Sequence, residues 1–410
     1  MDTFSFSVAS RANAPHIAAR AVPLLFIPLT LLLFLPLPWA ITGWFALPVY
    51  FVWRWRAQHS PVPVTRANWF VLLLLVGVVI GLMTSPARLD GIAAAGKLLA
   101  GVTAFYVLLD VLKSERDMWR AASGVVLMGL ALVLLLPFGV SWSADKVYAL
   151  PAFLDWTLRP PGQGTNPNIV GGMLATIFPL ALALLFSPRR REQILGAVAL
   201  GPFLIALVIL QARGAWFALI GGLAVGAAFF RRWLVPVLPL LGLALLYVNQ
   251  QTGGAETLSD VLYGKIGTPT GGTLQERMGM WTQALDLLRA HPLTGIGMGG
   301  YPYVAPYAPP YSPQAPGMIF PHAHNVFLQV ALDTGIVGLI GFAGMLLLAM
   351  HAAWRAQRDR FAYPLTLALL ASFAVIVLHS LGDGVFWNLK AQWLLWILYG
   401  IAFAAEQRAH

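Results

Sequence analysis

Twelve apolar runs constrain this chain more than any other feature of its sequence. They cover residues 22–36, 38–53, 69–84, 92–112, 119–138, 169–187, 193–211, 214–230, 233–249, 326–350, 362–381 and 386–404. A helix needs about 20 apolar residues to cross a bilayer. The runs are solid apolar blocks, whereas the strands of a transmembrane barrel alternate in polarity over about 10 residues. The sequence therefore predicts an all-α integral membrane protein with about twelve transmembrane helices.

Composition excludes several other classes of protein. Hydrophobic residues make up 59% of the chain and charged residues 10%, against about 45–50% and about 25% in soluble domains. The absence of cysteine excludes disulfides, thiol catalysis and cysteine metal sites. The net charge of +10 is scattered in small groups between the apolar runs, so it indicates membrane topology and not nucleic-acid binding.

The distribution of Lys and Arg predicts the orientation in the membrane. With a cytoplasmic N-terminus, 17 of the 26 Lys and Arg residues fall in cytoplasmic loops, 8 fall outside, and Lys97 lies inside a span. Cytoplasmic loops carry an excess of these residues, so we expect both termini to be cytoplasmic. The chain then divides into helices one to nine (residues 1–249), a large periplasmic loop (250–325) and helices ten to twelve (326–410).

The periplasmic loop contains one predicted helix, at about residues 273–290. Thr273-Leu-Gln-Glu276 has the pattern of a capping box. We expect this helix to be amphipathic and to lie along the membrane surface or over the outer mouth of the bundle. Its apolar stripe, at helical spacing, is formed by Leu274, Met278, Trp281, Leu285 and Leu288.

Four short patterns occupy predicted outer positions. They are Thr165-Asn-Pro-Asn168-Ile-Val-Gly171, Gln211-Ala-Arg213-Gly214-Ala215, Arg277-x-x-x-Trp281 followed by His291-Pro292-x-x-Gly295-x-Gly297, and His324-Asn325 followed by Gly335 and Gly338. In this order they resemble the signature of bacterial O-antigen ligases, within the wider O-antigen ligase/polymerase superfamily. The resemblance covers most of the second half of the chain. Gln211 departs from it, because Ser or Thr is expected near the arginine.

The resemblance implies a GT-C-like inverting glycosyltransferase of the bacterial inner membrane. Such an enzyme acts in lipopolysaccharide biosynthesis on the periplasmic side, without a metal, nucleotide or other cofactor. Its partners are an undecaprenyl-diphosphate-linked O-antigen glycan as donor, the lipid A-core oligosaccharide as acceptor, and membrane lipids. Nucleic acid is not expected as a partner.

An inverting displacement needs one base for the acceptor hydroxyl, without the second, nucleophilic carboxylate of a retaining enzyme. His324 suits the base because a histidine side chain is mostly neutral at neutral pH; the alternative is an interfacial histidine that caps a helix. His322 is expected to orient or bind the acceptor, and to point elsewhere on a continuing helix. A histidine pair at this spacing can also bind metal, but no carboxylate accompanies it at suitable sequence spacing, so no metal site is predicted.

The diphosphate needs permanently charged donors. Arg213 and Arg277 suit it, because a guanidinium matches phosphate oxygens in bidentate geometry. The alternatives are that Arg213 snorkels to the headgroups and that Arg277 solvates the polar face of its helix. Arg159 and Arg289 are further candidates. Lys97 is the one basic residue at membrane depth and either reaches the diphosphate or pairs with Asp383 or a backbone carbonyl.

Supporting roles are assigned to three polar residues. Asp383, in His379-Ser-Leu-Gly-Asp383-Gly, is expected to orient His324 or to hold an arginine. Asn168 and Asn325 are expected to make hydrogen bonds at helix ends. Close helix packing is the predicted role of Gly222, Gly226, Gly335, Gly338, Gly341 and Gly344.

Three rival functions stay open. An O-antigen polymerase or a protein O-oligosaccharyltransferase would share donor, base and arginines and differ in acceptor. A protein-modifying enzyme often carries a larger C-terminal soluble region, and the sequence ends at His410, which favours the ligase. A lipid-linked sugar transporter would favour inverted repeats and broken helices. The sequence has no internal repeat, and Lys97 is the one charge expected at membrane depth. Both observations argue against a transporter.

Overall fold

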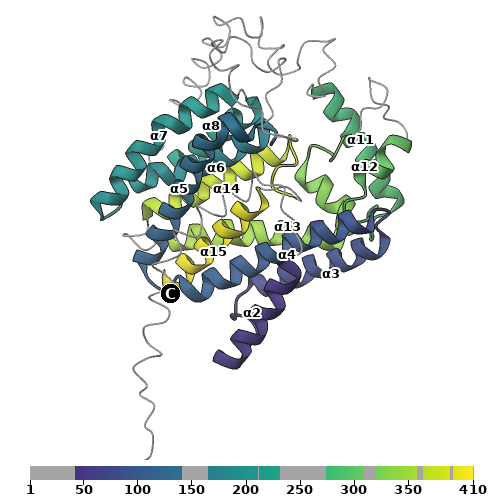
Figure 1. The fold of residues 1–410 in the computed structure, drawn as a ribbon, viewed down its shortest axis with the longest axis horizontal. Coiled ribbons are helices and arrows are strands. Elements are labelled where there is room, and N and C mark those ends of the chain that lie inside the picture. Colours follow the sequence, from purple (N-terminus) through teal and green to yellow (C-terminus); the bar gives the residue numbers. More distant parts are fainter. Residues whose placement is uncertain are drawn as a thin grey trace, which may run out of the picture.

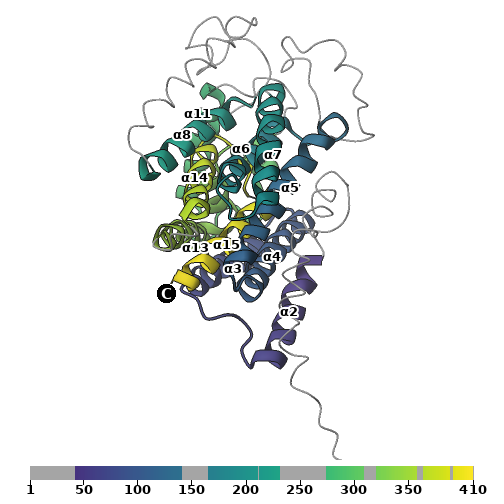
Figure 2. The same cartoon turned by 90° about the vertical axis from the view of Figure 1, so that its left-hand side faces the viewer.

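The computed structural model describes residues 42–140, 165–210, 212–230, 274–308, 320–357, 363–387 and 391–409. In these ranges the chain is helical apart from turns and one isolated bridge between Val140 and Thr165. Figures 1 and 2 show the helices as one bundle. They are α2 (Thr42–Gln58), α3 (Ala67–Thr84), α4 (Arg88–Val111), α5 (Glu115–Gly139), α6 (Pro167–Leu184), α7 (Arg190–Leu210), α8 (Arg213–Phe230), α11 (Leu274–Ala290), α12 (Tyr301–Val304), α13 (Val326–Ala356), α14 (Tyr363–Ser380) and α15 (Gln392–Ala409).

Seven of these helices are long and apolar enough to cross a membrane, namely α3, α4, α5, α6, α7, α13 and α14. This agrees with the prediction of an all-α integral membrane protein. The predicted spans at 22–36 and 233–249, and the loop before Leu274, lie outside the described residues. The count of twelve, the three-part division of the chain and its orientation therefore stay predictions.

Glycines bring several helices into close contact. A Cβ built on Gly341 would lie 2.4 Å from the Leu74 nitrogen of α3, and one on Gly77 would lie 2.6 Å from Gly338 Cα. In the same way, Gly222 of α8 leaves 2.7 Å between its ideal Cβ and the Ala371 oxygen of α14. Small residues allow membrane helices to approach this closely. The predicted packing role is confirmed for Gly222, Gly338 and Gly341.

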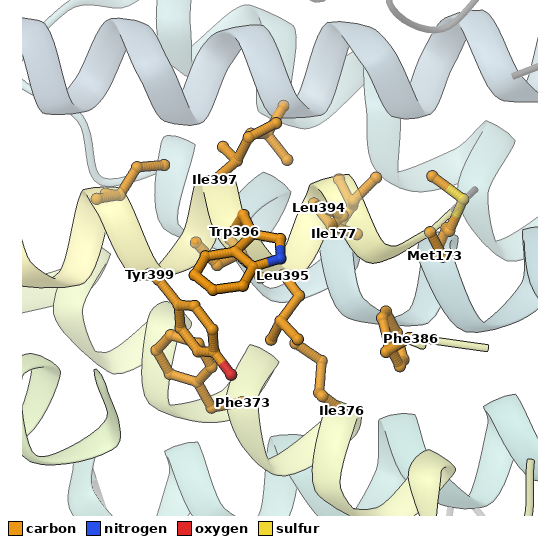
Figure 3. Close-up of a cluster of buried hydrophobic side chains, with 14 of the residues drawn as sticks. Met173, Ile177, Phe373, Ile376, Phe386, Leu394, Leu395, Trp396, Ile397 and Tyr399 are labelled. Atoms are coloured by element: carbon orange, nitrogen blue, oxygen red, sulfur yellow. The ribbon is translucent and has the colours of Figure 1, made fainter. Parts of the chain in front are cut away.

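The centre of the bundle is filled by aromatic side chains on α14 and α15 (Figure 3). Trp396 packs edge-on against Tyr399 at 5.4 Å between ring centroids, and Tyr399 stacks on Phe373 at 5.9 Å. The indole fits because Gly101 of α4 has no side chain: its ideal Cβ would lie 2.2 Å from Trp396 Cδ1. α15 is thus a central helix of the bundle, although it is not one of the seven candidate spans.

α13 is broken at Gly335, and the loop that follows α11 fills the break. Gly335 has φ +67°, and a Cβ there would lie 1.8 Å from the Leu293 oxygen. The loop backbone replaces the missing helical bonds: Ile336 N donates to Pro292 O (3.0 Å), and Ile296 N donates to Leu332 O (2.7 Å). Gly335 therefore packs closely against this loop, whereas close packing between helices was predicted for it. Broken helices also occur in transporters, but here protein backbone, not a substrate cavity, occupies the break.

α11 is present as predicted, but the predicted stripe does not describe its buried face. Met278 and Leu285 are 55% and 45% exposed, whereas Met280 and Ala284 are fully buried. The reason is that α11 packs on α13 and on residues 301–308, where Gln283 donates to Ala305 O at 2.7 Å. A polar residue therefore belongs to the inward face, which apolar spacing cannot identify. The predicted capping box begins at Thr273, outside the described residues.

Candidate active site

The site is built around the non-helical segment that precedes α13. Asn325 is the N-cap of α13: its Oδ1 accepts from Leu328 N (3.1 Å), and its Nδ2 donates to Leu381 O (3.1 Å). His324 has φ +48°, a left-handed conformation that is uncommon for a residue other than glycine. Such conformations persist only where the surroundings enforce them, often in functional sites. The cap also joins this segment to the turn after α14.

The two imidazoles of this segment lie side by side. Their ring centroids are 4.3 Å apart, and the backbone N–H of His324 donates to His322 Nδ1 at 3.2 Å. The expectation that His322 points elsewhere is wrong, because it assumed a continuing helix. The left-handed residue turns the chain and brings both rings to one place.

A carboxylate from the turn after α14 completes the group. Asp383 Oδ1 lies 3.4 Å from His324 Nδ1 and accepts from Gly384 N at 2.7 Å. Its Oδ2 accepts from Asn168 Nδ2 of α6 at 3.3 Å. Asp383 therefore joins His324 to α6, and it offers an acceptor that can hold a proton on Nδ1 and leave Nε2 to act as a base.

Burial and neighbouring charges shift the pKa values of Asp383 and His322. Burial alone would raise the pKa of Asp383, but the imidazoles of His324, His322 and His379 outweigh it and hold this pKa well below its usual range. Burial lowers the pKa of His322 to about 4, with His324 and Arg277 adding to the effect and Asp383 opposing it. At neutral pH the group contains an ionised Asp383 and a neutral His322.

Arg277 of α11 reaches the same place. Its Nη1 would lie 3.3 Å from a Cβ at Gly382, the residue before Asp383. Arg277 Nε and Trp281 Nε1 are buried and have no hydrogen-bond partner in the described part of the chain. At a spacing of four residues the two donors share one face of α11. Buried unpaired donors cost free energy, so this face suits a ligand that brings anionic oxygen atoms.

The other predicted residues differ in their surroundings. Arg213 is exposed at the start of α8, and its neighbour Gly214 lies beside the buried His379, with 3.9 Å from its ideal Cβ to Nε2. Arg289 forms an exposed ion pair with Asp286 at 2.6 Å. Lys97 is half-buried in the interior of α4. Arg159 lies outside the described residues. Roles in substrate binding stay predictions for all of them.

Sequence reasoning overlooked Asp333 and His379, which are both buried. Asp333 is the one acidic residue in the run 326–350 and is fully buried in α13, so counting a single charge at membrane depth was wrong. A carboxylate inside a predicted span is itself a signal of function. His379 carried no comparable signal, because its closeness to Gly172 of α6 depends on the packing of two distant helices.

His322, His324 and Asp383 also form a group that could hold a metal ion. One ligand atom each of His322, His324 and Asp383 lie within 4.8 Å of one another. The sequence predicted no metal site because Asp383, although selected as a partner of His324, belongs to a distant turn. Several of these atoms already serve hydrogen bonds within the group, His322 Nδ1 to His324 N and Asp383 to Gly384 and Asn168. Metal independence stays a prediction that a chelator tests.

Part of the chain that includes Arg277 and His324 of this site is similar to a known protein family. Residues 198–343 match the family model described as O-Antigen ligase. Over these residues the chain is similar to the O-antigen ligase family. The matched range contains Arg213, Arg277 and His324, whereas Asp383 lies outside it.

A curated relative is similar to part of the chain. It is the exopolysaccharide production protein ExoQ of Rhizobium meliloti (strain 1021), 23% identical over 201 residues. The match covers 46% of this chain and 45% of that protein. The chain thus spans about half the length of this relative.

The environment of His322 predicts a pH dependence of stability. Folding lowers its pKa from 6.5 to about 4, so between these values the unfolded chain binds a proton that the folded protein does not. The contribution of His322 to the free energy of unfolding is therefore complete above pH 6.5 and decreases as the pH falls toward 4. We expect the thermal unfolding midpoint of the detergent-solubilised protein to fall over this interval, and to fall less in His322→Gln. The exposed His291→Gln should follow the wild type, and an unchanged slope in His322→Gln would contradict the assignment.

Proposed function

We propose that this protein is an inverting, metal-independent glycosyltransferase of the inner membrane that uses His324 as general base. It transfers an O-antigen glycan from undecaprenyl diphosphate to a hydroxyl of the lipid A-core oligosaccharide on the periplasmic side. The observation that carries the proposal is the 3.4 Å approach of His324 Nδ1 to Asp383 Oδ1, with the Arg277 guanidinium beside the same turn. The match of residues 198–343 to the O-antigen ligase model supports the reaction class.

In the proposed reaction, the acceptor hydroxyl oxygen attacks the anomeric carbon from the face opposite the diphosphate. His324 Nε2 takes the hydroxyl proton as the new C–O bond forms, and Asp383 stabilises the resulting imidazolium through Nδ1–H. The bond between the anomeric carbon and the diphosphate oxygen breaks, and its electron pair stays on that oxygen. Undecaprenyl diphosphate leaves, and the proton passes from His324 to solvent. The ground-state Nδ1–Oδ1 distance is long for a hydrogen bond, as is common before substrate binds.

The leaving diphosphate gains negative charge as the bond breaks. Arg277 is suited to that charge because its guanidinium is permanently ionised and its buried Nε has no protein acceptor among the described residues. Trp281 Nε1 offers a neutral donor one turn along the same face. Arg213 begins α8, next to Gly214, which lies beside His379. It is proposed as the second cation, with Arg159, Arg289 and Lys97 as further candidates.

A second candidate function differs only in the acceptor. The relative ExoQ is described as an exopolysaccharide production protein, which favours a glycan chain as acceptor, as in a polymerase. The histidine pair and the arginines serve both reactions equally. We therefore regard acceptor identity as the main question for experiment.

Reconstitution with two competing acceptors tests both candidates. Purified protein in detergent receives an undecaprenyl-diphosphate glycan, core-bearing lipid A and EDTA, and products are separated by mass. The proposal expects glycan joined to the lipid A-core at a rate that EDTA does not change. Longer glycans on undecaprenyl diphosphate would instead indicate a polymerase. Loss of activity with EDTA, restored by a divalent ion, would overturn metal independence.

Arg277→Ala is expected to weaken donor binding. A hydrogen bond to a charged group is worth about 1.5–3 kcal/mol, so the donor KM should rise roughly 10- to 100-fold. Arg88→Ala serves as the matched control, because Arg88 is exposed at the start of α4. Donor KM values that are equal in the two variants would exclude Arg277 from the diphosphate site.

A further inference from the structure

A buried carboxylate two residues before the break at Gly335 in α13 has no role in the proposed reaction. Asp333 is fully buried, and three N–H groups donate to it. Trp387 Nε1 donates to Oδ2 at 2.8 Å, while Gln329 Nε2 and Gly299 N donate to Oδ1 at 3.0 and 3.3 Å. A charge inside a membrane helix is costly unless such donors compensate it. The three donors supply this compensation for Asp333.

Gln329 connects this carboxylate to the histidine segment. Its Nε2 donates to Asp333, and its Oε1 accepts from the backbone N–H of Ala323 at 2.9 Å. Ala323 is fully buried and stands between His322 and His324. A side-chain amide can accept on one atom and donate on the other. Gln329 therefore links Asp333 to the backbone amide of Ala323 by two hydrogen bonds. The amide belongs to the residue just before the left-handed His324.

The same carboxylate holds two other parts of the site. Trp387 follows the turn that carries Asp383, and Gly299 ends the loop that continues from α11, the helix of Arg277. The three donors thus connect Asp333 to the histidine segment, through Gln329 and Ala323 N, to the turn of Asp383, and to the loop that follows α11. A single buried acceptor fixes their relative positions.

We propose that Gln329 and Asp333 are positioning residues that hold His324 in its reactive orientation. They act through the Ala323 amide and the Trp387 indole and do not touch substrate. The inference rests on the proposed function only where activity is the readout. The geometry of the histidine pair can be tested without any turnover.

The test compares Gln329→Leu, Gln329→Glu and wild type in the full chain, with Leu347→Ala as control. Leu347 lies on α13 and is 66% exposed. Leucine removes both hydrogen bonds. The carboxyl group of Gln329→Glu, when protonated, donates to Asp333 and accepts from Ala323 as the amide does, whereas its ionised form faces a second carboxylate. The charged group facing residue 329 is Asp333, and His322 and His324 flank Ala323.

Two measurements are made on each protein. The first is the rate at which diethyl pyrocarbonate modifies His322 and His324, followed by peptide mass spectrometry. The second is kcat and donor KM. For Gln329→Leu we expect faster modification and a kcat reduced roughly 10- to 100-fold, the usual effect of displacing a reacting group by about 1 Å. Donor KM should stay near that of wild type, because Arg277 is not displaced.

The glutamate variant separates positioning from general damage. Its kcat relative to wild type should rise as the pH falls from about 8 to about 6 while donor KM stays constant, whereas the ratio for Gln329→Leu should stay flat. Flat ratios for both variants, or wild-type modification rates in Gln329→Leu, would overturn the proposal. If Gln329→Leu does not fold, the pH response of Gln329→Glu decides alone. If wild type transfers no glycan, modification rates still test the positioning while the proposed function fails.

Discussion

Replacing His324 by alanine is expected to abolish glycan transfer while leaving donor binding in place. A general base contributes about 10²- to 10⁴-fold to the rate, and the neighbouring imidazole cannot replace it, because His322 Nδ1 is occupied by the His324 backbone N–H at 3.2 Å. The donor contacts come from other elements, with Arg277 on α11. We therefore expect kcat to fall by at least about 10² while the donor Kd changes by less than about threefold.

The matched control is His291→Ala, since His291 is exposed just after α11. Single-turnover rates and donor Kd values should be measured in the same detergent for both variants. Full activity of His324→Ala would remove the base from the mechanism. A large loss of donor affinity in this variant would instead make His324 a ligand of the donor.

The predicted parts of the fold are those that depend on local sequence. Apolar runs of span length identify helices such as α3, α5 and α13, because a lipid-embedded segment must satisfy its backbone internally. The His324-Asn325 pattern also placed a helix start, since an asparagine N-cap satisfies a free backbone N–H of the first turn. Asp383 was selected from sequence, and the structure brings it beside His324.

The overlooked parts depend on backbone conformation and on contacts between distant segments. The direction of the His322 side chain follows from the positive φ of His324. The residue type does not predict this backbone conformation, because histidine rarely adopts it. The role of Gly335 depends on the Leu293 carbonyl that enters the helix break. The inward face of α11 includes Gln283, whose partner Ala305 lies in another element. Periodicity describes one helix at a time and cannot supply such partners.

Asp383→Asn is expected to lower kcat nearly as much as loss of the base. The amide is neutral, so it no longer stabilises the imidazolium that forms when His324 takes the hydroxyl proton. In addition, both carboxylate oxygens of the wild-type Asp383 accept hydrogen bonds, from Gly384 N and Asn168 Nδ2. The asparagine amide places an N–H donor against one of these two donors. In hydrolases that use a similar pair, this substitution costs about 10⁴-fold, and we expect at least about 10² here.

A double variant decides whether Asp383 acts through His324. Groups that work as one unit are strongly non-additive, so His324→Ala/Asp383→Asn should be no slower than His324→Ala alone. Asp286→Asn, in an exposed ion pair on α11, is the control for loss of a carboxylate. Because its neighbours hold the pKa of Asp383 well below the usual range, this carboxylate stays ionised through mildly acidic pH, and an activity loss there must come from another group. Additive losses in the double variant would show that Asp383 serves the fold or the donor independently of the base.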